Sequence, residues 1–120
     1  MSTTVLLVDD SGLARRSTRR VLEQAGYHVV EAEDGLSALE RYAVDKPDVV
    51  LLDLVMKGMY GLDVLAKLRE MDPTARVIVV SADVQTSSHE LVAAAGASGF
   101  LVKPVDADQI LQLVRSTLET

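Results

Sequence analysis

Short apolar runs alternate along the chain with longer segments in which apolar residues recur every three or four positions. The runs cover residues 5–8, 27–32, 47–53, 76–82 and 98–104. Consecutive aliphatic residues bounded by turn-forming residues are typical of strands that are buried on both faces of a sheet. Residues 27–32 alternate less regularly between apolar and polar, which predicts a strand nearer the edge of the sheet.

The segments between these runs have helical spacing, and capping or breaking residues mark their ends. The predicted ends, in chain order, are a cap at Ser11 and a stop at Gly26, an opening at Asp34-Gly35 and a stop before Pro47, a stop at Asp72-Pro73, a helix over roughly 85–95 stopped by Gly96, and a last helix from Asp106. The positions predicted to face the core are Ala14, Ser17, Thr18, Val21, Leu22 and Ala25, then Leu36, Leu39, Tyr42 and Ala43, then Leu62, Leu65 and Leu68, and finally Ile110, Leu113, Val114 and Leu118.

Five strands alternating with five helices favour an α/β fold, in which helices cover both faces of a parallel sheet. A chain of 120 residues with 48% hydrophobic content can bury a full core without disulfides or metal. We therefore expect a single domain over residues 1–120, with no effector domain in this chain.

Composition and charge narrow the functional classes. The chain has no cysteine, no signal-peptide pattern and no apolar run near the roughly 20 residues of a membrane span, so we expect a soluble cytoplasmic protein. The net charge of -6 disfavours binding to nucleic-acid backbones, and three Tyr, one Phe and no Trp offer little surface for base stacking. A small charged ligand or a protein partner is the expected class of ligand.

Charged and polar residues stand where four of the predicted strands end. These residues are Asp9 and Asp10, Asp53, Ser81 and Lys103. Ligands of open parallel sheets bind outside the carboxyl ends of the strands, so we expect these side chains to converge. Crowded carboxylates repel one another unless a cation joins them, and a set of oxygen ligands suits Mg²⁺.

Such a site predicts phosphoryl chemistry. With its charge offset by the metal and by Lys103, the carboxylate of Asp53 can attack an electrophilic phosphorus and form an aspartyl phosphate. Ser81 would donate a hydrogen bond to a phosphoryl oxygen, and Lys103 would supply a compact positive charge beside it.

The spacing of these motifs resembles a known family over essentially all 120 residues. The motifs are Asp9-Asp10-Ser11, Asp53 followed by Met56 and Gly61, Ser81-Ala82, and Lys103-Pro104. Together they resemble the receiver domain of two-component response regulators, and the length and residues 97–104 resemble its stand-alone, chemotaxis-type members. The resemblance implies a flavodoxin-like, doubly wound (βα)5 sandwich with a five-stranded parallel sheet in the order 2-1-3-4-5.

The resemblance also implies roles for the acidic residues. Asp53 is similar to the phosphoacceptor, and Asp10 and Asp53 are similar to direct Mg²⁺ ligands, with Mn²⁺ as a substitute. Asp9 matches a ligand that acts largely through water. Val55 stands where the family supplies a backbone carbonyl to the metal.

The remaining matches concern the conformational switch. Ser81 matches the switch hydroxyl and Phe100 the switch aromatic, here without the hydroxyl of a tyrosine. Lys103 matches the phosphate-binding lysine, and the Lys103-Pro104 peptide is expected to be cis, as X-Pro bonds readily allow.

Departures from the family pattern cluster after the acceptor. Lys57 stands where Pro is common and Tyr60 where Asp or Asn is common. Val55 and Asp83 occupy positions that tune how fast the phosphate is lost. We hypothesise that Lys57 alters phosphodonor access or kinetics without removing competence, which a comparison with Lys57→Pro would test.

The function that the resemblance implies is a phosphorylation-driven signalling switch that catalyses only its own phosphorylation and dephosphorylation. Its expected partners are a sensor histidine kinase or phosphotransfer protein, and a downstream protein that binds the face formed by the fourth helix, fifth strand and last helix. Val92, Leu111 and Val105 are expected on that face. A monomer or weak dimer that binds no nucleic acid directly is expected.

Three alternatives stay open. An aspartyl-phosphate phosphatase or phosphotransferase would need an acid two residues after the nucleophile, where this chain has Val55. A flavodoxin-like cofactor carrier would need a phosphate-binding loop where Asp9-Asp10 stands. A pseudo-receiver that only binds proteins remains open because of Lys57 and Tyr60.

Other polar residues have simpler interpretations. Arg15, Arg16, Arg19 and Arg20 fall mostly on the helix face opposite the core, which indicates a solvated face, with a partner-docking face as the alternative. His28 and His89 lack the spacing of metal ligands and are predicted to lie on the surface.

Overall fold

Alternating strands and helices wind into a single sheet with helices on both sides. The computed structural model describes residues 2–56, 60–82 and 86–119, the side chains of 86–88 excepted. The elements are β1 (Thr4–Val8), α1 (Gly12–Gln24), β2 (His28–Ala32), α2 (Gly35–Asp45), β3 (Val49–Asp53), α3 (Gly61–Met71), β4 (Val77–Ser81), α4 (Thr86–Ala94), β5 (Gly99–Val102) and α5 (Ala107–Leu118). The strands are parallel and lie in the order β2-β1-β3-β4-β5, which confirms the predicted fold class.

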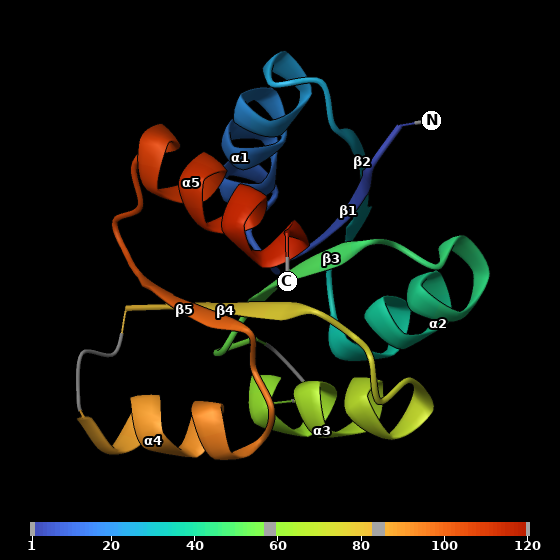
Figure 1. The fold of residues 1–120 in the computed structure, drawn as a ribbon, viewed down its shortest axis with the longest axis vertical. Helices are drawn as coiled ribbons and strands as arrows, with labels where there is room; N and C mark the ends of the chain where they lie inside the picture. The colour runs from blue at the N-terminus through green and yellow to red at the C-terminus, as the bar shows by residue number, and fades with distance from the viewer. Residues whose placement is uncertain (1, 57–59, 83–85, 120) are drawn as a thin grey trace.

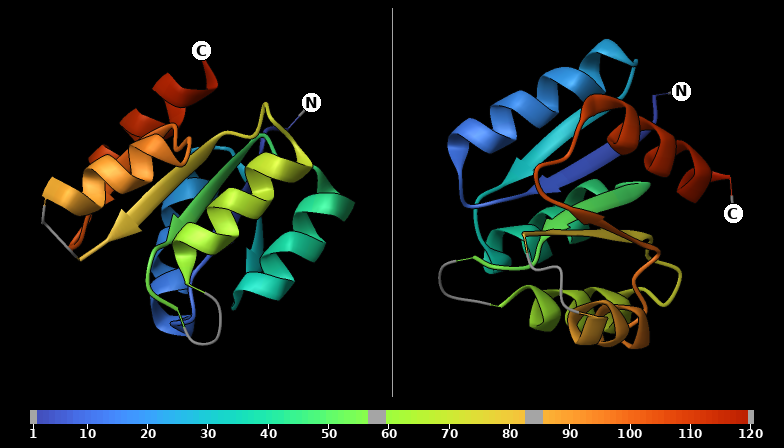
Figure 2. Two further views of the ribbon diagram at one scale, coloured as in Figure 1. Left: turned by 90° about the horizontal axis from the view of Figure 1, so that it is seen from below. Right: turned by 90° about the vertical axis from the view of Figure 1, so that its left-hand side faces the viewer.

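Helices α1 and α5 cover one face of the sheet, and α2, α3 and α4 cover the other (Figure 1, Figure 2). Because side chains alternate between the faces of a strand, each strand supplies both cores. Val5, Leu7 and Leu51 pack towards α1 and α5, whereas Leu6 and Leu52 pack towards the other three helices. Burial on both faces explains why β1 and β3 are continuous aliphatic runs.

Side-chain caps fix where several helices begin. The Ser11 hydroxyl accepts a hydrogen bond from the Ala14 N–H, and the Asp34 carboxylate accepts one from the Ser37 N–H. Asp106 forms a capping box with Gln109 at the start of α5. These contacts confirm the predicted starts of α1, α2 and α5, and so fix where the loops that follow β1, β2 and β5 end.

The predicted inward faces of α1 and α2 are partly wrong. Leu36 is 67% exposed, and Ser17, Ala25 and Ala43 are also exposed, whereas Ala38 is fully buried. In α2 the buried stripe contains Gly35, Ala38 and Tyr42, so small residues bring the helix close to the sheet. Apolar residues outnumber the positions that this contact can cover, and periodicity alone does not decide which of them are left outside.

Val92 is buried at 2% exposure and packs into the core beneath α4, so its predicted place on a partner-binding surface is wrong. Its neighbour Leu91 is the exposed residue, at 58%. Leu111 and Val105 are partly buried. Among the described residues, no helix is both long enough and apolar enough to cross a bilayer.

Candidate functional site

Three aspartates meet at the carboxyl edge of the sheet, as predicted. Asp53 ends β3 and Asp9 follows β1, and these two strands are parallel neighbours with Val8 opposite Leu52. Asp9 and Asp53 are 7% and 8% exposed, while Asp10 is exposed. One carboxylate oxygen from each of Asp9, Asp10 and Asp53 lies within 4.8 Å of the others.

Backbone N–H groups hold two of these carboxylates in place. The Ser11 N–H donates to Asp9 Oδ1 at 2.9 Å, and the Val55 N–H donates to Asp53 Oδ1 at 3.2 Å. Each carboxylate is thus bound by the residue two positions later, which directs its second oxygen away from its own loop. The second oxygens are the ones that Lys103 contacts.

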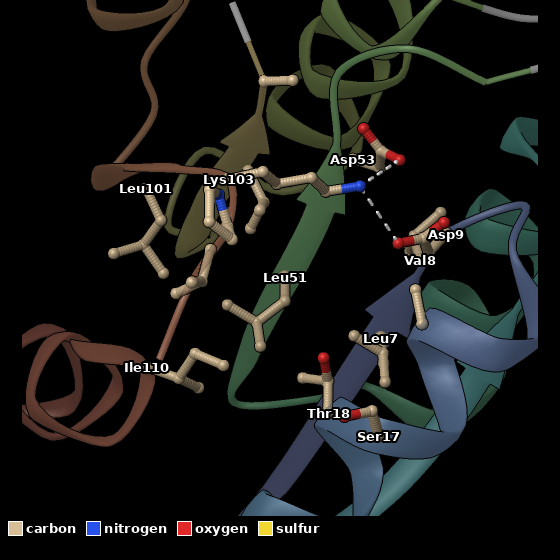
Figure 3. A pocket seen from close by; sticks show the side chains of 15 residues that line it. Leu7, Val8, Asp9, Ser17, Thr18, Leu51, Asp53, Leu101, Lys103 and Ile110 are labelled. Carbon is tan, nitrogen blue, oxygen red and sulfur yellow. Dashed lines mark hydrogen bonds and ion pairs between the residues drawn. The ribbon is translucent and has the colours of Figure 1, made fainter. Parts of the chain in front are cut away.

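Lys103 reaches this cluster from the segment after β5. Its Nζ lies 3.1 Å from Asp53 Oδ2 and 3.5 Å from Asp9 Oδ2 (Figure 3). The Lys103 N–H donates to the Ser81 carbonyl at 2.8 Å, and the Lys103-Pro104 peptide is cis, as predicted. Lys103 therefore links the ends of β4 and β5 to the acids on β1 and β3.

Burial and pairing act in opposite directions on this ion pair. Burial raises the pKa of Asp53, with a further contribution from Asp9, and outweighs the hydrogen bond from Lys103. For Lys103 burial acts to lower the pKa, but the side chain is 35% exposed and the two carboxylates outweigh burial, so its pKa is raised. Three carboxylates and one ammonium leave two negative charges, which one divalent cation would neutralise.

The two predicted switch residues lie on the neighbouring strands. Ser81 ends β4, is 1% exposed and lies opposite Val102 of β5. Phe100, on β5, packs against the core beneath α3 and α4, and its ring stacks on the imidazole of His89 with 3.9 Å between the centroids. His89 is exposed, as predicted, but its contact with Phe100 was not evident from sequence.

A cavity of about 490 Å³ opens beside the acids and runs between α1, α5 and the sheet (Figure 3). Leu7, Leu51, Leu101 and Ile110 form much of its wall, and the α1 side is closed only by Ala14, Ser17 and Thr18. Small side chains on α1 leave space that larger aliphatic residues would fill. The spacing of α1 predicted that Ala14 and Thr18 face inward but did not reveal the space.

The loop after the acceptor begins and ends in close contact. The Gly61 N–H donates to the Leu54 carbonyl at 2.8 Å, and a Cβ on Gly61 would lie 2.6 Å from Leu54 Cα. Only glycine fits this approach, which gives a physical reason for the Gly61 motif. Tyr60 occupies the N-cap position of α3 without a capping hydrogen bond from its side chain and is 45% exposed, and Val55 is 64% exposed. The predictions for Lys57 and Asp83 lie outside the described residues.

The arginine face of α1 is only half solvated. Arg16 and Arg20 are exposed, as predicted. Arg15 and Arg19 instead bind Glu31 of β2, with side chains that are 17% and 39% exposed. Sequence missed this contact because Glu31 comes close to α1 only once β2 pairs with β1.

Among known families, the model of the response regulator receiver domain matches residues 5–115 of this chain. The chain belongs to this family. The chain is 38% identical to a chemotaxis protein CheY of Bacillus subtilis, over 98% of this chain and 99% of that protein. Receiver domains are signalling proteins of two-component systems, and they bind Mg²⁺ at an acidic cluster. In this chain Asp9, Asp10 and Asp53 form a group of this kind.

Solved structures agree with this assignment. A CheY-like receiver domain protein from Methanospirillum hungatei has a TM-score of 0.94 at 25% identity, covering 99% of this chain and 95% of that chain. The CheY in a CheX-CheY-BeF3-Mg²⁺ complex from Borrelia burgdorferi has a TM-score of 0.91 at 33% identity, covering 95% and 87%. The receiver domain described here therefore shares the whole fold with both.

Proposed function

We propose that this receiver domain is a phosphorylation-driven switch, in which Asp53 accepts a phosphoryl group from the phosphohistidine of a sensor histidine kinase or phosphotransfer protein. The observation that carries the proposal is the Asp9, Asp10 and Asp53 cluster with Lys103 Nζ 3.1 Å from Asp53. Lys103 offsets only one of the three carboxylate charges, so the cluster keeps the negative charge that a divalent cation would neutralise.

Asp9, Asp10 and Asp53 would hold Mg²⁺, with the Val55 carbonyl as a further ligand. The donor set fits the ion because every side-chain donor is a carboxylate oxygen, and a hard cation prefers such ligands. When bound, Mg²⁺ supplies charge that offsets both the carboxylates and the phosphoryl oxygens. Mn²⁺ has the same preference for oxygen and is expected to substitute.

The transfer itself is a displacement at phosphorus. A carboxylate oxygen of Asp53 forms the new O–P bond while the P–N bond to the donor imidazole breaks, and the released nitrogen takes up a proton. Lys103, which now pairs with Asp53 and Asp9, would exchange one of these partners for a phosphoryl oxygen. The Ser81 hydroxyl, at the end of the adjacent strand, would donate to another oxygen.

The phosphoryl group would change the partner-binding face through Ser81 and Phe100. Phosphorylation adds about -1.5 to -2 charge at neutral pH, and new charge-assisted hydrogen bonds can bias a two-state element. Movement of Ser81 towards the phosphoryl group would free space beside β5 for Phe100. The output surface would then be the face of α4, β5 and α5, where Leu91 is exposed.

The test is phosphorylation by acetyl phosphate, read as intact mass. With Mg²⁺ the protein should gain one phosphoryl group, and with EDTA or in Asp53→Asn it should gain none. Asp48→Asn is the matched control, because Asp48 lies at the other end of β3 and binds only the Thr4 N–H among the contacts described for its side chain. A phosphoryl gain that persists in Asp53→Asn, or that never appears with Mg²⁺, would refute the proposal.

A further inference from the structure

The guanidinium of Arg15 joins the acidic loop to the neighbouring strand β2. Its Nη1 donates to the backbone carbonyl of Asp9 at 2.6 Å, and its Nε donates to Glu31 Oε1 at 3.0 Å. Only 17% of the side chain is exposed. Arg15 thus touches the acidic cluster through backbone and not through a carboxylate.

The contacted carbonyl belongs to the peptide between Asp9 and Asp10. Because a peptide unit is planar, fixing the direction of the Asp9 carbonyl also fixes where the Cα of Asp10 lies. The N–H of Asp9 donates to the Ala32 carbonyl at 3.2 Å, so Asp9 is held from both sides of its Cα. Asp10 is exposed, so the direction of this peptide has a direct effect on where its carboxylate lies.

Glu31 in turn holds the guanidinium in place. It binds Arg15 and also Arg19, and Arg19 binds Glu23 at 3.2 Å. Burial acts to raise the pKa of Glu31, but the hydrogen bonds from Arg19 and Arg15 outweigh it and the pKa is lowered. A planar guanidinium that is fixed at Nε by a carboxylate has little freedom left at Nη1.

We propose that Arg15 is a positioning residue of the metal site, which orients the Asp9–Asp10 peptide so that both carboxylates face Asp53 and Mg²⁺ binds more tightly. The inference rests on the proposed binding of Mg²⁺ to this cluster. It assigns Arg15 no contact with the metal or with the phosphoryl group. Its role is to set geometry through the backbone.

Electrostatic repulsion between Arg15 and Mg²⁺, taken alone, predicts that removing Arg15 strengthens metal binding. Removing a cation near an Mg²⁺ site would strengthen binding of the metal, because a repulsion disappears. Loss of the positioning contact would weaken binding. The sign of the change in affinity therefore separates geometry from charge.

The experiment is titration of the protein with MgCl₂ by calorimetry at physiological ionic strength. We expect Arg15→Gln to weaken Mg²⁺ binding about tenfold, the lower end of the losses seen when partners of metal ligands are removed. Arg19→Gln is the matched control, since it also loses a cation and a bond to Glu31 but does not contact Asp9. It should bind Mg²⁺ within about twofold of the parent or slightly more tightly.

Two further variants complete the test. Arg15→Lys keeps the charge but lacks the rigid fork, so it should also bind Mg²⁺ more weakly than the parent. It serves as well if Arg15→Gln fails to fold. Asp10→Asn should abolish the Mg²⁺ titration, which tests the metal site separately. Parent affinity in Arg15→Gln, or in Arg15→Lys, would overturn the positioning role while leaving the metal site intact, whereas no titration in the parent would refute the metal site.

Discussion

Lys103 and Asp53 form an ion pair, with 3.1 Å between Nζ and Oδ2, although burial raises the pKa of Asp53. The pair is therefore too weak to compensate fully for the transfer of the Asp53 carboxylate out of water. The ionised carboxylate of Asp53 therefore lowers the stability of the metal-free fold. A bound cation would compensate this charge, so the cluster favours cation binding.

Replacing Asp53 with Asn should raise the melting temperature of the metal-free protein at neutral pH. A carboxyl group whose folded pKa is raised contributes stability that is complete below its unfolded pKa of about 3.9 and is lost as pH rises through the folded pKa. The gain from Asp53→Asn should therefore shrink as pH falls towards that value. Thermal melts at several pH values in EDTA would measure it.

Saturating Mg²⁺ should reverse the order, because it stabilises the parent and binds poorly to Asp53→Asn. A lower melting temperature for Asp53→Asn at neutral pH without metal would contradict this account. It would mean that the Lys103 contact outweighs burial.

Filling the cavity beside α1 should stabilise the fold. Ala14 lines the cavity, so Ala14→Leu should add apolar contacts and raise the free energy of unfolding by about 1 kcal/mol. Ala66→Leu, on the exposed side of α3, should change it by less than about 0.5 kcal/mol. Urea unfolding of both variants would measure these changes. Equal changes in the free energy of unfolding would show that the cavity does not accept a larger side chain.

A methyl group at Gly61 should be poorly tolerated. Its Cβ would lie 2.6 Å from both Cα and O of Leu54, so Gly61→Ala should cost about 1–3 kcal/mol of unfolding free energy. At Gly12 the same substitution meets only an Arg15 nitrogen at 3.7 Å and should be neutral or stabilising by up to about 1 kcal/mol. Denaturation curves that rank the two variants in the other order would contradict the close approach.

Loss of the His89 ring should favour the phosphorylated conformation. If Phe100 leaves its stack with His89 on activation, the contact stabilises the unphosphorylated state, and aromatic pairs of this kind contribute about 0.5–1.5 kcal/mol. His89→Ala should therefore bind beryllofluoride with Mg²⁺ more tightly, by up to about tenfold, in an NMR titration. His28→Ala, at an exposed position of β2, should leave the affinity for beryllofluoride unchanged. Weaker binding in His89→Ala would mean that the stack survives activation.

The sequence predicted the site because parallel topology places every strand end at one edge. Asp9, Asp53, Ser81 and Lys103 could be assigned to that edge without knowing any distance, since each ends or directly follows a recognisable strand. Side-chain spacing within the site follows from the order and register of β1, β3, β4 and β5; the order was expected from the family resemblance, and the register comes from the structure.

The contacts that sequence missed each join two different elements or loops of the fold. Arg15 was assigned to a solvated face because neither Glu31 nor the Asp9 carbonyl is adjacent to it in sequence. Leu36 was assigned to the core because helical spacing fixes a period but not a phase. Small residues such as Ala38 decide the phase by how closely they let a helix approach.

The hydrogen bond from Gly61 to Leu54 fastens the β3–α3 connection at its base, next to the acceptor. This backbone hydrogen bond does not depend on the side chains of Val55 and Tyr60, which are both exposed. Substitutions at Val55 and Tyr60 can therefore alter the surroundings of Asp53 with little effect on folding. The rate of phosphoryl transfer and the stability of the fold can therefore be tuned at separate positions of this domain.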